Sequence, residues 1–151
     1  MNITPKKLNT FTIFKLPAAY FCGVRTKYID SDKCIVTVKH QWINQNPFKS
    51  MFWAVQGMAA EFSTGALMIG KIQASQKKVS MLVTSNTATF SKKATGKITF
   101  TCSDGYLIDE ALNKAIETGE GQTIWMTSTG LNQEGIEVST FKFEWSIKVK
   151  S

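Results

Sequence analysis

The sequence contains almost no arginine: its 18 basic residues are 17 lysines and Arg25. Base recognition and tight phosphate clamping normally use the planar, bidentate guanidinium group, so sequence-specific nucleic-acid binding is disfavoured. We therefore expect no nucleic-acid partner. The net charge of +7 and the sequence pI near 9.4 still favour an anionic partner of another kind.

Histidine is equally scarce, because His40 is the only one. It lies in an expected strand beside Val38 and Trp42, a setting typical of a packed or surface histidine. A Ser-His-Asp arrangement, a histidine-rich metal site, a P-loop and a G-x-G-x-x-G motif are all missing from the sequence. We expect neither a metal nor a cofactor.

The three cysteines, Cys22, Cys34 and Cys102, follow no C-x-x-C or Cys/His spacing. This favours reduced, packed thiols in a cytoplasmic protein. Met1–Lys15 also lacks the continuous apolar run and small-residue cleavage site of a signal peptide, so we expect none.

The order of the expected elements predicts an α+β fold within a single domain, residues 1–151. A mostly antiparallel sheet would pack on one long helix. The expected elements are a lead over Met1–Tyr20 ended by Pro17, strands over Phe21–Tyr28 and Lys33–Ile43, a helix over Met51–Gly70, strands over Val79–Ser91 and Gly96–Ser103, a helix over 107–116, and a hairpin of Gln122–Leu131 and Gly135–Lys150.

The long helix is apolar almost all the way round, which is typical of a core helix wrapped by other structure. Asn46 before Pro47 is a suitable start, and Ser50 is an alternative cap one turn later. Gly70 is the expected end. A length of about twenty residues also fits a membrane span, but Glu61 at the centre argues against one, and we expect none.

Glu61 is the only acidic residue between Asp32 and Asp104, a window that holds nine lysines. A carboxylate in an apolar helix costs several kcal/mol unless it is paired, hydrogen-bonded or neutralised. Gly57 and Gly65 lie four residues to either side and leave space beside it, for another backbone or for a ligand. In the alternative, Glu61 caps a backbone or pairs with a lysine, and the glycines only allow close packing.

A strand pair, a buried helix entered through an asparagine-containing loop, and four further strands resemble the hotdog fold of acyl-CoA thioesterases. The resemblance covers roughly Pro17 to Val149. It is closest to the uncharacterised DUF4442 proteins, neighbours of the phenylacetate-pathway (PaaI-like) thioesterases. In such enzymes a loop asparagine precedes a His-Gly-Gly that opens the helix, and a helical Asp or Glu follows nine residues after the histidine.

This resemblance implies catalytic roles for two residues fifteen positions apart, Asn46 as the loop asparagine and Glu61 as the acid. Phe52, Trp53 and Ala54 occupy the His-Gly-Gly positions. Ser80 falls where some members place a polar residue that reaches the partner's site. The implied chemistry is that Glu61 activates water or attacks the thioester carbonyl, while helix N–H groups near Trp53 and Ala54 hold the oxyanion.

The first functional hypothesis is therefore an acyl-CoA thioesterase that works as a homodimer or a dimer of dimers. The second is a non-catalytic hotdog domain that binds an acyl chain or another apolar ligand, because His-Gly-Gly is replaced. A dehydratase is a distant third, since His40 lies far from Glu61 in the sequence. The sequence leaves open whether Asn46 only starts the helix, and whether Phe52 and Trp53 are core residues or walls of an acyl tunnel.

Overall fold

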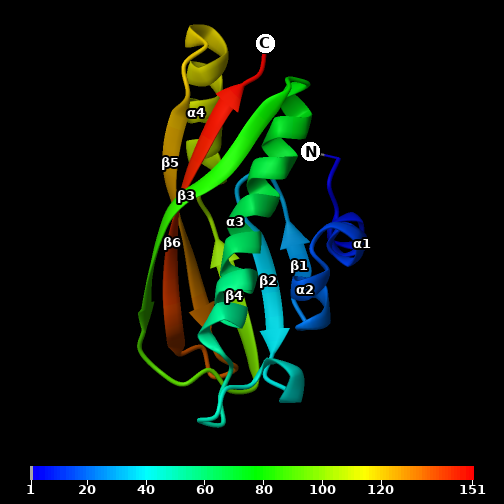
Figure 1. Cartoon of the computed structure of the whole chain (residues 1–151), viewed down its shortest axis with the longest axis vertical. Helices are drawn as coiled ribbons and strands as arrows, with labels where there is room; N and C mark the ends of the chain where they lie inside the picture. The colour runs from blue at the N-terminus through cyan, green and yellow to red at the C-terminus, as the bar shows by residue number, and fades with distance from the viewer. Residues whose placement is uncertain (1) are drawn as a thin grey trace.

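The computed structural model describes residues 2–151, in which six strands form one antiparallel sheet with a long helix lying along it (Figure 1). The elements in chain order are α1 (Pro5–Lys15), α2 (Pro17–Phe21), β1 (Arg25–Ile29), β2 (Cys34–Lys39), the 3-10 turn η1 (Trp42–Asn44), α3 (Trp53–Ser75), β3 (Val79–Phe90), β4 (Lys97–Cys102), α4 (Gly105–Thr118), β5 (Gln122–Leu131) and β6 (Glu137–Val149). The predicted α+β class, with a long central helix on an antiparallel sheet, is confirmed.

The strands lie in the order β1-β2-β4-β5-β6-β3, and every neighbouring pair is antiparallel. Helix α3 packs against β2, β4 and β5 in the middle of this sheet. The two edge strands are β1 and β3. Strand β3 has 12 residues, and its second half is exposed, so it presents a long row of unpaired backbone groups to its surroundings.

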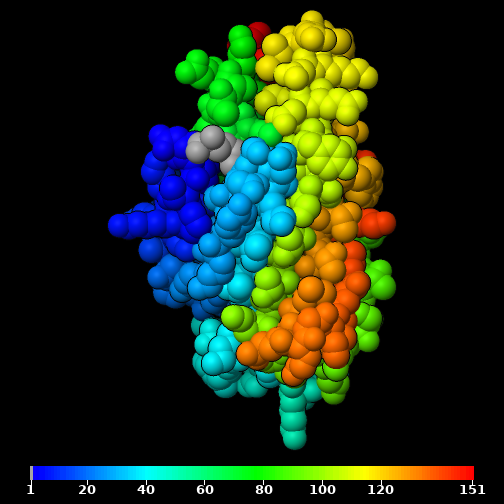
Figure 2. Space-filling view, turned by 180° about the vertical axis from the view of Figure 1, so that it is seen from behind, coloured from blue at the N-terminus to red at the C-terminus, as the bar shows by residue number. Residues whose placement is uncertain are grey.

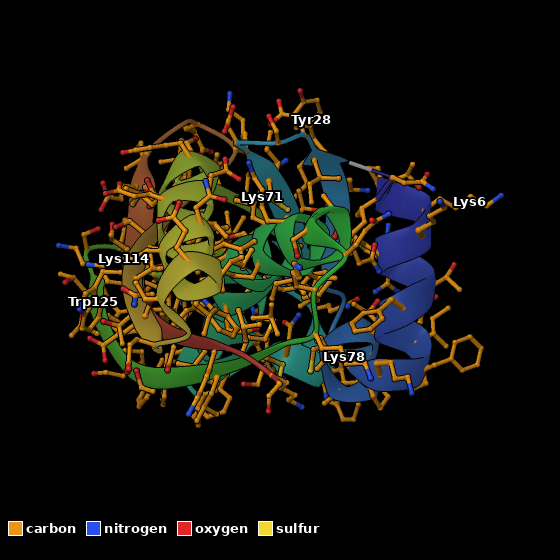
Figure 3. All side chains as sticks on the ribbon, turned by 90° about the horizontal axis from the view of Figure 1, so that it is seen from above. Lys6, Tyr28, Lys71, Lys78, Lys114 and Trp125 are labelled. Carbon is orange, nitrogen blue, oxygen red and sulfur yellow. The ribbon has the colours of Figure 1, made fainter. Side chains whose placement is uncertain are left out.

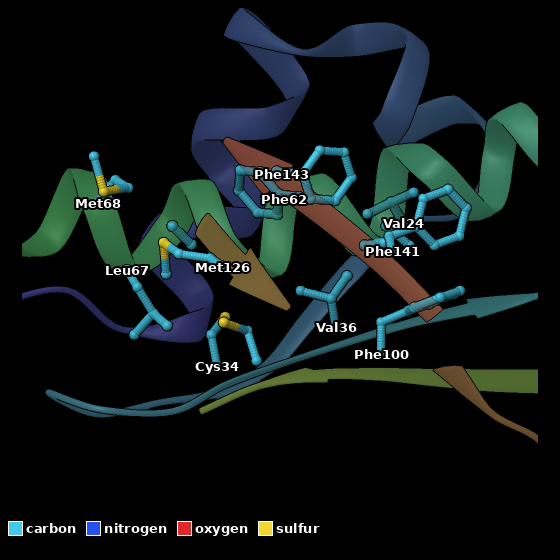
Figure 4. Packing of buried hydrophobic residues seen from close by; sticks show 14 of the residues in the cluster. Val24, Cys34, Val36, Phe62, Leu67, Met68, Phe100, Met126, Phe141 and Phe143 are labelled. Carbon is cyan, nitrogen blue, oxygen red and sulfur yellow. The ribbon is translucent and has the colours of Figure 1, made fainter. Parts of the chain in front are cut away.

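The core fills the space between α3 and the sheet (Figure 4). Strand β6 shows how it is built: Phe141, Phe143, Trp145 and Ile147 are buried, whereas the residues between them are more exposed. Phe141 stacks on Phe143 and meets Phe100 of β4 edge-on. This period of two is the pattern of a strand with one face on the core, and it confirms the predicted last strand.

Three polar side chains on the buried side of α3 are matched by partners on the sheet. Gln56 Oε1 accepts a hydrogen bond from Ser139 over 2.7 Å. The Ser63 and Ser128 hydroxyl oxygens lie 2.7 Å apart, and Trp145 donates its indole N–H to Thr64 Oγ1 over 2.9 Å. Because buried polar groups are costly without partners, these pairs fix the position of the helix along the sheet.

Seen from above, α3 lies between α4 on one side and α1 on the other (Figure 3). Lys71 of α3 pairs with Asp109 of α4 at 2.5 Å. On the other side, Asn9 of α1 exchanges two hydrogen bonds with the backbone of Thr26 in β1. The view from behind shows α1 and α2 along one flank of the molecule, beside β1 and β2 (Figure 2).

Both predicted ends of the long helix are wrong. The helix begins at Trp53 after Phe52, which has extended φ and ψ of −58° and 131°, because Asn46 and Ser50 bond to each other within their own turn. It continues past Gly70, which is buried, and ends at Ser75, where Gln76 adopts φ of 56°. The Lys71–Asp109 pair lies on this unpredicted extension.

The first strand and the lead also differ from the prediction. Residues 5–15 and 17–21 form two helices, and Pro17 begins the second one, a position where its missing N–H is not needed. Gly23 then turns the chain with φ of 95°, so the strand starts at Arg25. Strand β2 ends at Lys39, which leaves Trp42 in a 3-10 turn with 82% of its surface exposed.

Candidate functional site

Glu61 lies midway along α3 and is half-buried. Within residues 2–151 its carboxylate has no ion-pair or hydrogen-bond partner; the one ion pair there joins Lys71 to Asp109. Burial alone raises its pKa to about 7, because removal from water disfavours the charged form. Such a group changes protonation near neutral pH, as a catalytic acid or base must.

The two glycines that flank Glu61 lie against aromatic rings of β6. A Cβ on Gly57 would stand 3.4 Å from the ring of Phe141, and one on Gly65 would stand 3.3 Å from the indole of Trp145. The same point at Gly65 is 3.6 Å from Glu61 Oε1. The glycines therefore let β6 approach the helix closely, and the carboxylate extends over Gly65, toward the carboxyl end of α3.

A pocket of about 310 Å³ opens at Glu61, between α3 and the junction of α1 with α2. Its lining is apolar apart from two charged residues, Glu61 and Lys15. The residues that form it are Lys15, Leu16, Pro17, Ala18, Ala19, Met58 and Glu61. Residues 15–19 were not predicted as site residues. The sequence of a short N-terminal helical segment does not indicate which part of the protein the segment packs against.

The amino end of α3 carries free backbone donors. The N–H groups of Trp53 and Ala54 have no acceptor among the described residues, as expected for the first turn of a helix whose cap residue, Phe52, has no side-chain oxygen. The first turn also contains no acidic residue. Donors of this kind, at the positive end of the helix dipole, suit an oxyanion.

A second pocket, of about 530 Å³, lies at this end of α3, between residues 46–56 and residues 90–94. Phe52 and Trp53 are 45% and 56% exposed there, so neither belongs to the core. Lys92 and Lys93 line the opposite side, and both are exposed. The pocket thus combines aromatic faces with positive charge.

Asn46 organises the turn that leads into this end of α3. Its Oδ1 accepts from the backbone N–H of Phe48 over 2.9 Å, and its Nδ2 donates to Ser50 Oγ over 3.0 Å. Asn44, two residues earlier, is buried and holds the chain still more firmly: Nδ2 donates to two carbonyl oxygens, and Oδ1 accepts from Gln41 N–H. The sequence alone offered no reason to prefer Asn44.

Ser80 lies near the start of β3 and is half-buried, with Oγ 3.2 Å from the carbonyl oxygen of Lys148. It lines neither of these two pockets. His40 lies just after β2 and also lines neither. Cys34 and Cys102 are buried opposite each other on β2 and β4, and burial raises the pKa of both thiols to about 12.

Apart from Ser80, the predicted site residues therefore fall into two groups on one chain. Ala54 and Trp53 stand at the start of α3, whereas Glu61 is eight residues further along, about 12 Å at 1.5 Å per residue. The carboxylate points away from that start, over Gly65. A single chain thus does not bring the free N–H groups and the carboxylate to the same substrate atom.

Two further properties concern the described part of the chain as a whole. Residues 2–151 contain no group of three or more His, Cys, Asp or Glu side chains placed to hold a metal ion. None of the helices described is both long enough and apolar enough to cross a membrane.

The chain belongs to the DUF4442 family, described as a domain of unknown function, whose sequence profile matches residues 7–147. This confirms the family predicted from the order of elements and the helical acid. A comparison with curated proteins gives no match.

Solved structures show that the fold is the hotdog fold of thioesterase-like proteins. A probable thioesterase of unknown function from Pseudomonas aeruginosa superposes with a TM-score of 0.82 at 18% identity, over 97% of each chain. A protein of unknown function from Chlorobaculum tepidum gives 0.83 at 19% identity, over 97% of this chain and 98% of its own. A thioesterase from Haemophilus influenzae gives 0.75 at 13% identity, over 99% and 93%.

Proposed function

We propose that the protein hydrolyses acyl-CoA thioesters, with Glu61 as the catalytic base or nucleophile. The observation that supports this most is the state of the Glu61 carboxylate: half-buried, without a partner in residues 2–151, open to an apolar pocket, and with a pKa raised to about 7. Structural acids are normally paired or exposed. An unpaired one beside a pocket is typical of a catalytic group.

The chemistry requires only the carboxylate and water. As a base, ionised Glu61 removes a proton from a water molecule that attacks the thioester carbonyl, and the thiolate leaves. As a nucleophile, it attacks the carbonyl itself and forms a mixed anhydride, the thiolate leaves, and water then hydrolyses the anhydride to the acid. In both routes negative charge develops on the carbonyl oxygen, which needs hydrogen-bond donors.

A second copy of the chain would supply those donors, because the free N–H groups of Trp53 and Ala54 lie about 12 Å from Glu61 along their own helix. In a two-fold dimer residue i meets residue j of the partner and j meets i. If Trp53 of one copy contacts Glu61 of the other, the two-fold axis passes beside residue 57, which is midway between them. Ala54 and Gly57 are half-buried at that level and would be covered by the partner.

The edge strand β3 offers the second element of such an interface. Among residues 2–151 it pairs only with β6, which leaves its other side free along 12 residues. Edge strands of this length are templates for pairing with another chain. Two copies joined through β3 form a continuous sheet in a homodimer, with Ser80 near the partner. Two such homodimers can associate in turn into a dimer of dimers.

The pocket at the start of α3 suits the nucleotide end of CoA. Lys92 and Lys93 attract its phosphates. The exposed rings of Phe52 and Trp53 offer faces on which an adenine can stack. Asn46 acts by holding the turn that shapes this wall, not by contact with the reacting atoms.

A panel of acyl-CoAs assayed with the wild type and Glu61→Gln, following release of the free thiol, tests this function. The isosteric change keeps the packing and removes the charge, so we expect a loss of about 10²–10⁴-fold in kcat/KM. Glu110→Gln on α4 is the matched control and retains activity. Equal rates for the wild type and Glu61→Gln would overturn the proposal.

A non-catalytic domain that binds an acyl chain is the second candidate. The replacement of His-Gly-Gly by Phe52-Trp53-Ala54 favours it, because Phe52 presents an apolar ring where the thioesterases that the sequence resembles have a histidine. Native mass spectrometry distinguishes the two candidates. A co-purified apolar ligand together with no hydrolysis of any acyl-CoA supports this one.

A further inference from the structure

The pocket beside Glu61 is built by the N-terminal helices, which lie outside the strands and the long helix of the fold. Leu16 separates α1 from α2 with φ and ψ of −136° and 57°, and Pro17 begins α2. The chain therefore changes direction at this point, and a hollow of about 310 Å³ lies between this junction and α3.

The walls of this hollow are small and apolar. Ala18 and Ala19 present single methyl groups on one side, and Met58 presents a flexible thioether on the other. A cluster of ordered water would need two to four polar partners for each molecule, and Lys15 and Glu61 are the only charged residues of the lining. The lining therefore favours an aliphatic occupant over a polar one.

The position of Glu61 indicates how such an occupant is oriented. Its carboxylate belongs to a lining that is apolar apart from Glu61 and Lys15, and it has no partner in residues 2–151. The ammonium group of Lys15, at the exposed end of α1, is the only positive charge in the lining. A carbonyl carbon held near Glu61 leaves its hydrocarbon tail to extend toward Leu16, Pro17 and Ala18.

We propose that this pocket binds the acyl chain of the thioester, and that its volume limits the length of the chain. The inference rests on the proposed function, since it assigns the acyl subsite of the same reaction. The volume equals about ten water molecules at roughly 30 Å³ each. A methylene group takes up about as much space as a water molecule, so the pocket holds about ten carbons, fewer than a palmitoyl chain has.

Two substitutions change the pocket in opposite directions without touching Glu61. Ala18→Leu adds bulk on the exposed side of α2, where the fold tolerates it, and Met58→Ala widens the pocket. The measurement is kcat/KM for acetyl-, butyryl-, hexanoyl- and palmitoyl-CoA with each variant. Ala74→Leu, on the exposed carboxyl end of α3, is the matched control.

We expect the wild type to favour hexanoyl-CoA over both acetyl- and palmitoyl-CoA. Ala18→Leu lowers the hexanoyl-to-acetyl ratio by about fourfold for each methylene it excludes, Met58→Ala moves the preference to longer chains, and Ala74→Leu changes nothing. Hydrolysis with a chain-length profile that neither pocket variant alters would overturn this assignment and leave the proposed function intact.

A binding measurement distinguishes failure of the proposed function from failure of the acyl-pocket assignment. In the Glu61→Gln background, in which hydrolysis is slow, the Kd of hexanoyl-CoA is compared with that of CoA by calorimetry, with and without Ala18→Leu. If no acyl-CoA is hydrolysed, the proposed function fails and the pocket is judged by affinity alone. Hexanoyl-CoA must then still bind at least tenfold more tightly than CoA, with Ala18→Leu removing most of that difference; equal affinities overturn the inference.

Discussion

The carboxylate of Glu61 extends over Gly65, with Oε1 only 3.6 Å from the point where a Cβ on residue 65 would stand. The indole of Trp145 occupies the other side of that point and is held by its hydrogen bond to Thr64. Gly65 is therefore the position at which the helix, the sheet and the acid meet. The backbone there passes close to a ring, and the carboxylate is directed away from the amino end of its own helix.

The raised pKa of Glu61 predicts a particular dependence of stability on pH. The pKa is about 7 in the folded protein, against an ordinary value of 4.5. Below pH 4.5 the group is protonated in both states and costs nothing. As the pH rises to 7 the unfolded chain ionises more readily, so the folded state loses stability, by at most about 3 kcal/mol, and the loss levels off above pH 7.

Glu61→Gln lacks this titration, so its stability advantage over the wild type should grow between pH 5 and pH 8. Urea unfolding of both proteins at four pH values and one protein concentration measures it. A constant difference across that range would mean that a partner group already compensates the carboxylate.

The two loop asparagines should differ in their effect on stability. Asn44 is buried with three hydrogen bonds to the backbone, so Asn44→Ala leaves unpaired groups in the interior and should cost about 2–4 kcal/mol. Asn46 is only half-buried, and Asn46→Ala should cost about 1 kcal/mol. Denaturant unfolding of both variants measures the order, and the reverse order would contradict the packing described for this loop.

Lys92 and Lys93 should contribute to binding of the CoA phosphates and not to binding of the acyl chain. Changing both to Gln should raise KM for acyl-CoA several-fold. Added salt should reduce this difference in KM between the variant and the wild type, because salt screens exposed charges. A truncated thioester without the nucleotide should be hydrolysed equally by both proteins. Lys77→Gln with Lys78→Gln, after the carboxyl end of α3, is the control. An equal effect on the truncated substrate would argue against phosphate binding.

The free N–H of Trp53 can be removed with little change to the helix, because proline is tolerated at its first residue and Phe52 already has the extended conformation that precedes a proline. Trp53→Pro should lower kcat by about 10²-fold, the usual effect of losing one oxyanion donor. Trp53→Ala removes the ring and keeps the N–H, so it should keep most of kcat. Equal losses in both variants would assign the effect to the ring.

Regular side-chain patterns made the strands and the fold predictable. Phe141, Phe143, Trp145 and Ile147 alternate without interruption, and their burial follows from the pleat of a strand with one covered face. Strands β3 and β4, the hairpin of β5 with β6, and helix α4 were predicted close to their observed bounds. The single acid in an apolar helix was likewise visible in the sequence.

The ends of α3 were not predictable, because tertiary contacts override local signals there. Asn46 is a good helix cap by type, yet it bonds to Ser50 in its own turn. Gly70 is a good helix end by type, yet it is buried, and Lys71 beyond it is tied to Asp109, 38 residues later in the chain. No local pattern records a partner at that separation.

The pocket beside Glu61 was missed for the same reason. Leu16, Pro17 and Ala18 form no motif in the sequence of the N-terminal segment, and only the fold places them beside Met58 and Glu61. The sequence identified the acid but not the wall opposite it. The exposure of Trp53 was not predictable either, because the apolar pattern of the helix predicts that such a residue is buried.

A shared site, in which one chain supplies Glu61 and its partner supplies the amino end of α3, can be tested by mixing two impaired variants. Glu61→Gln and Trp53→Pro are unfolded together and refolded as a 1:1 mixture, so that about half of the dimers are mixed. Each mixed dimer has one site with both defects and one site with neither. If the site is shared between the two chains, the mixture should recover about a quarter of wild-type thioesterase activity. Activity no higher than the mean of the two variants alone would contradict it.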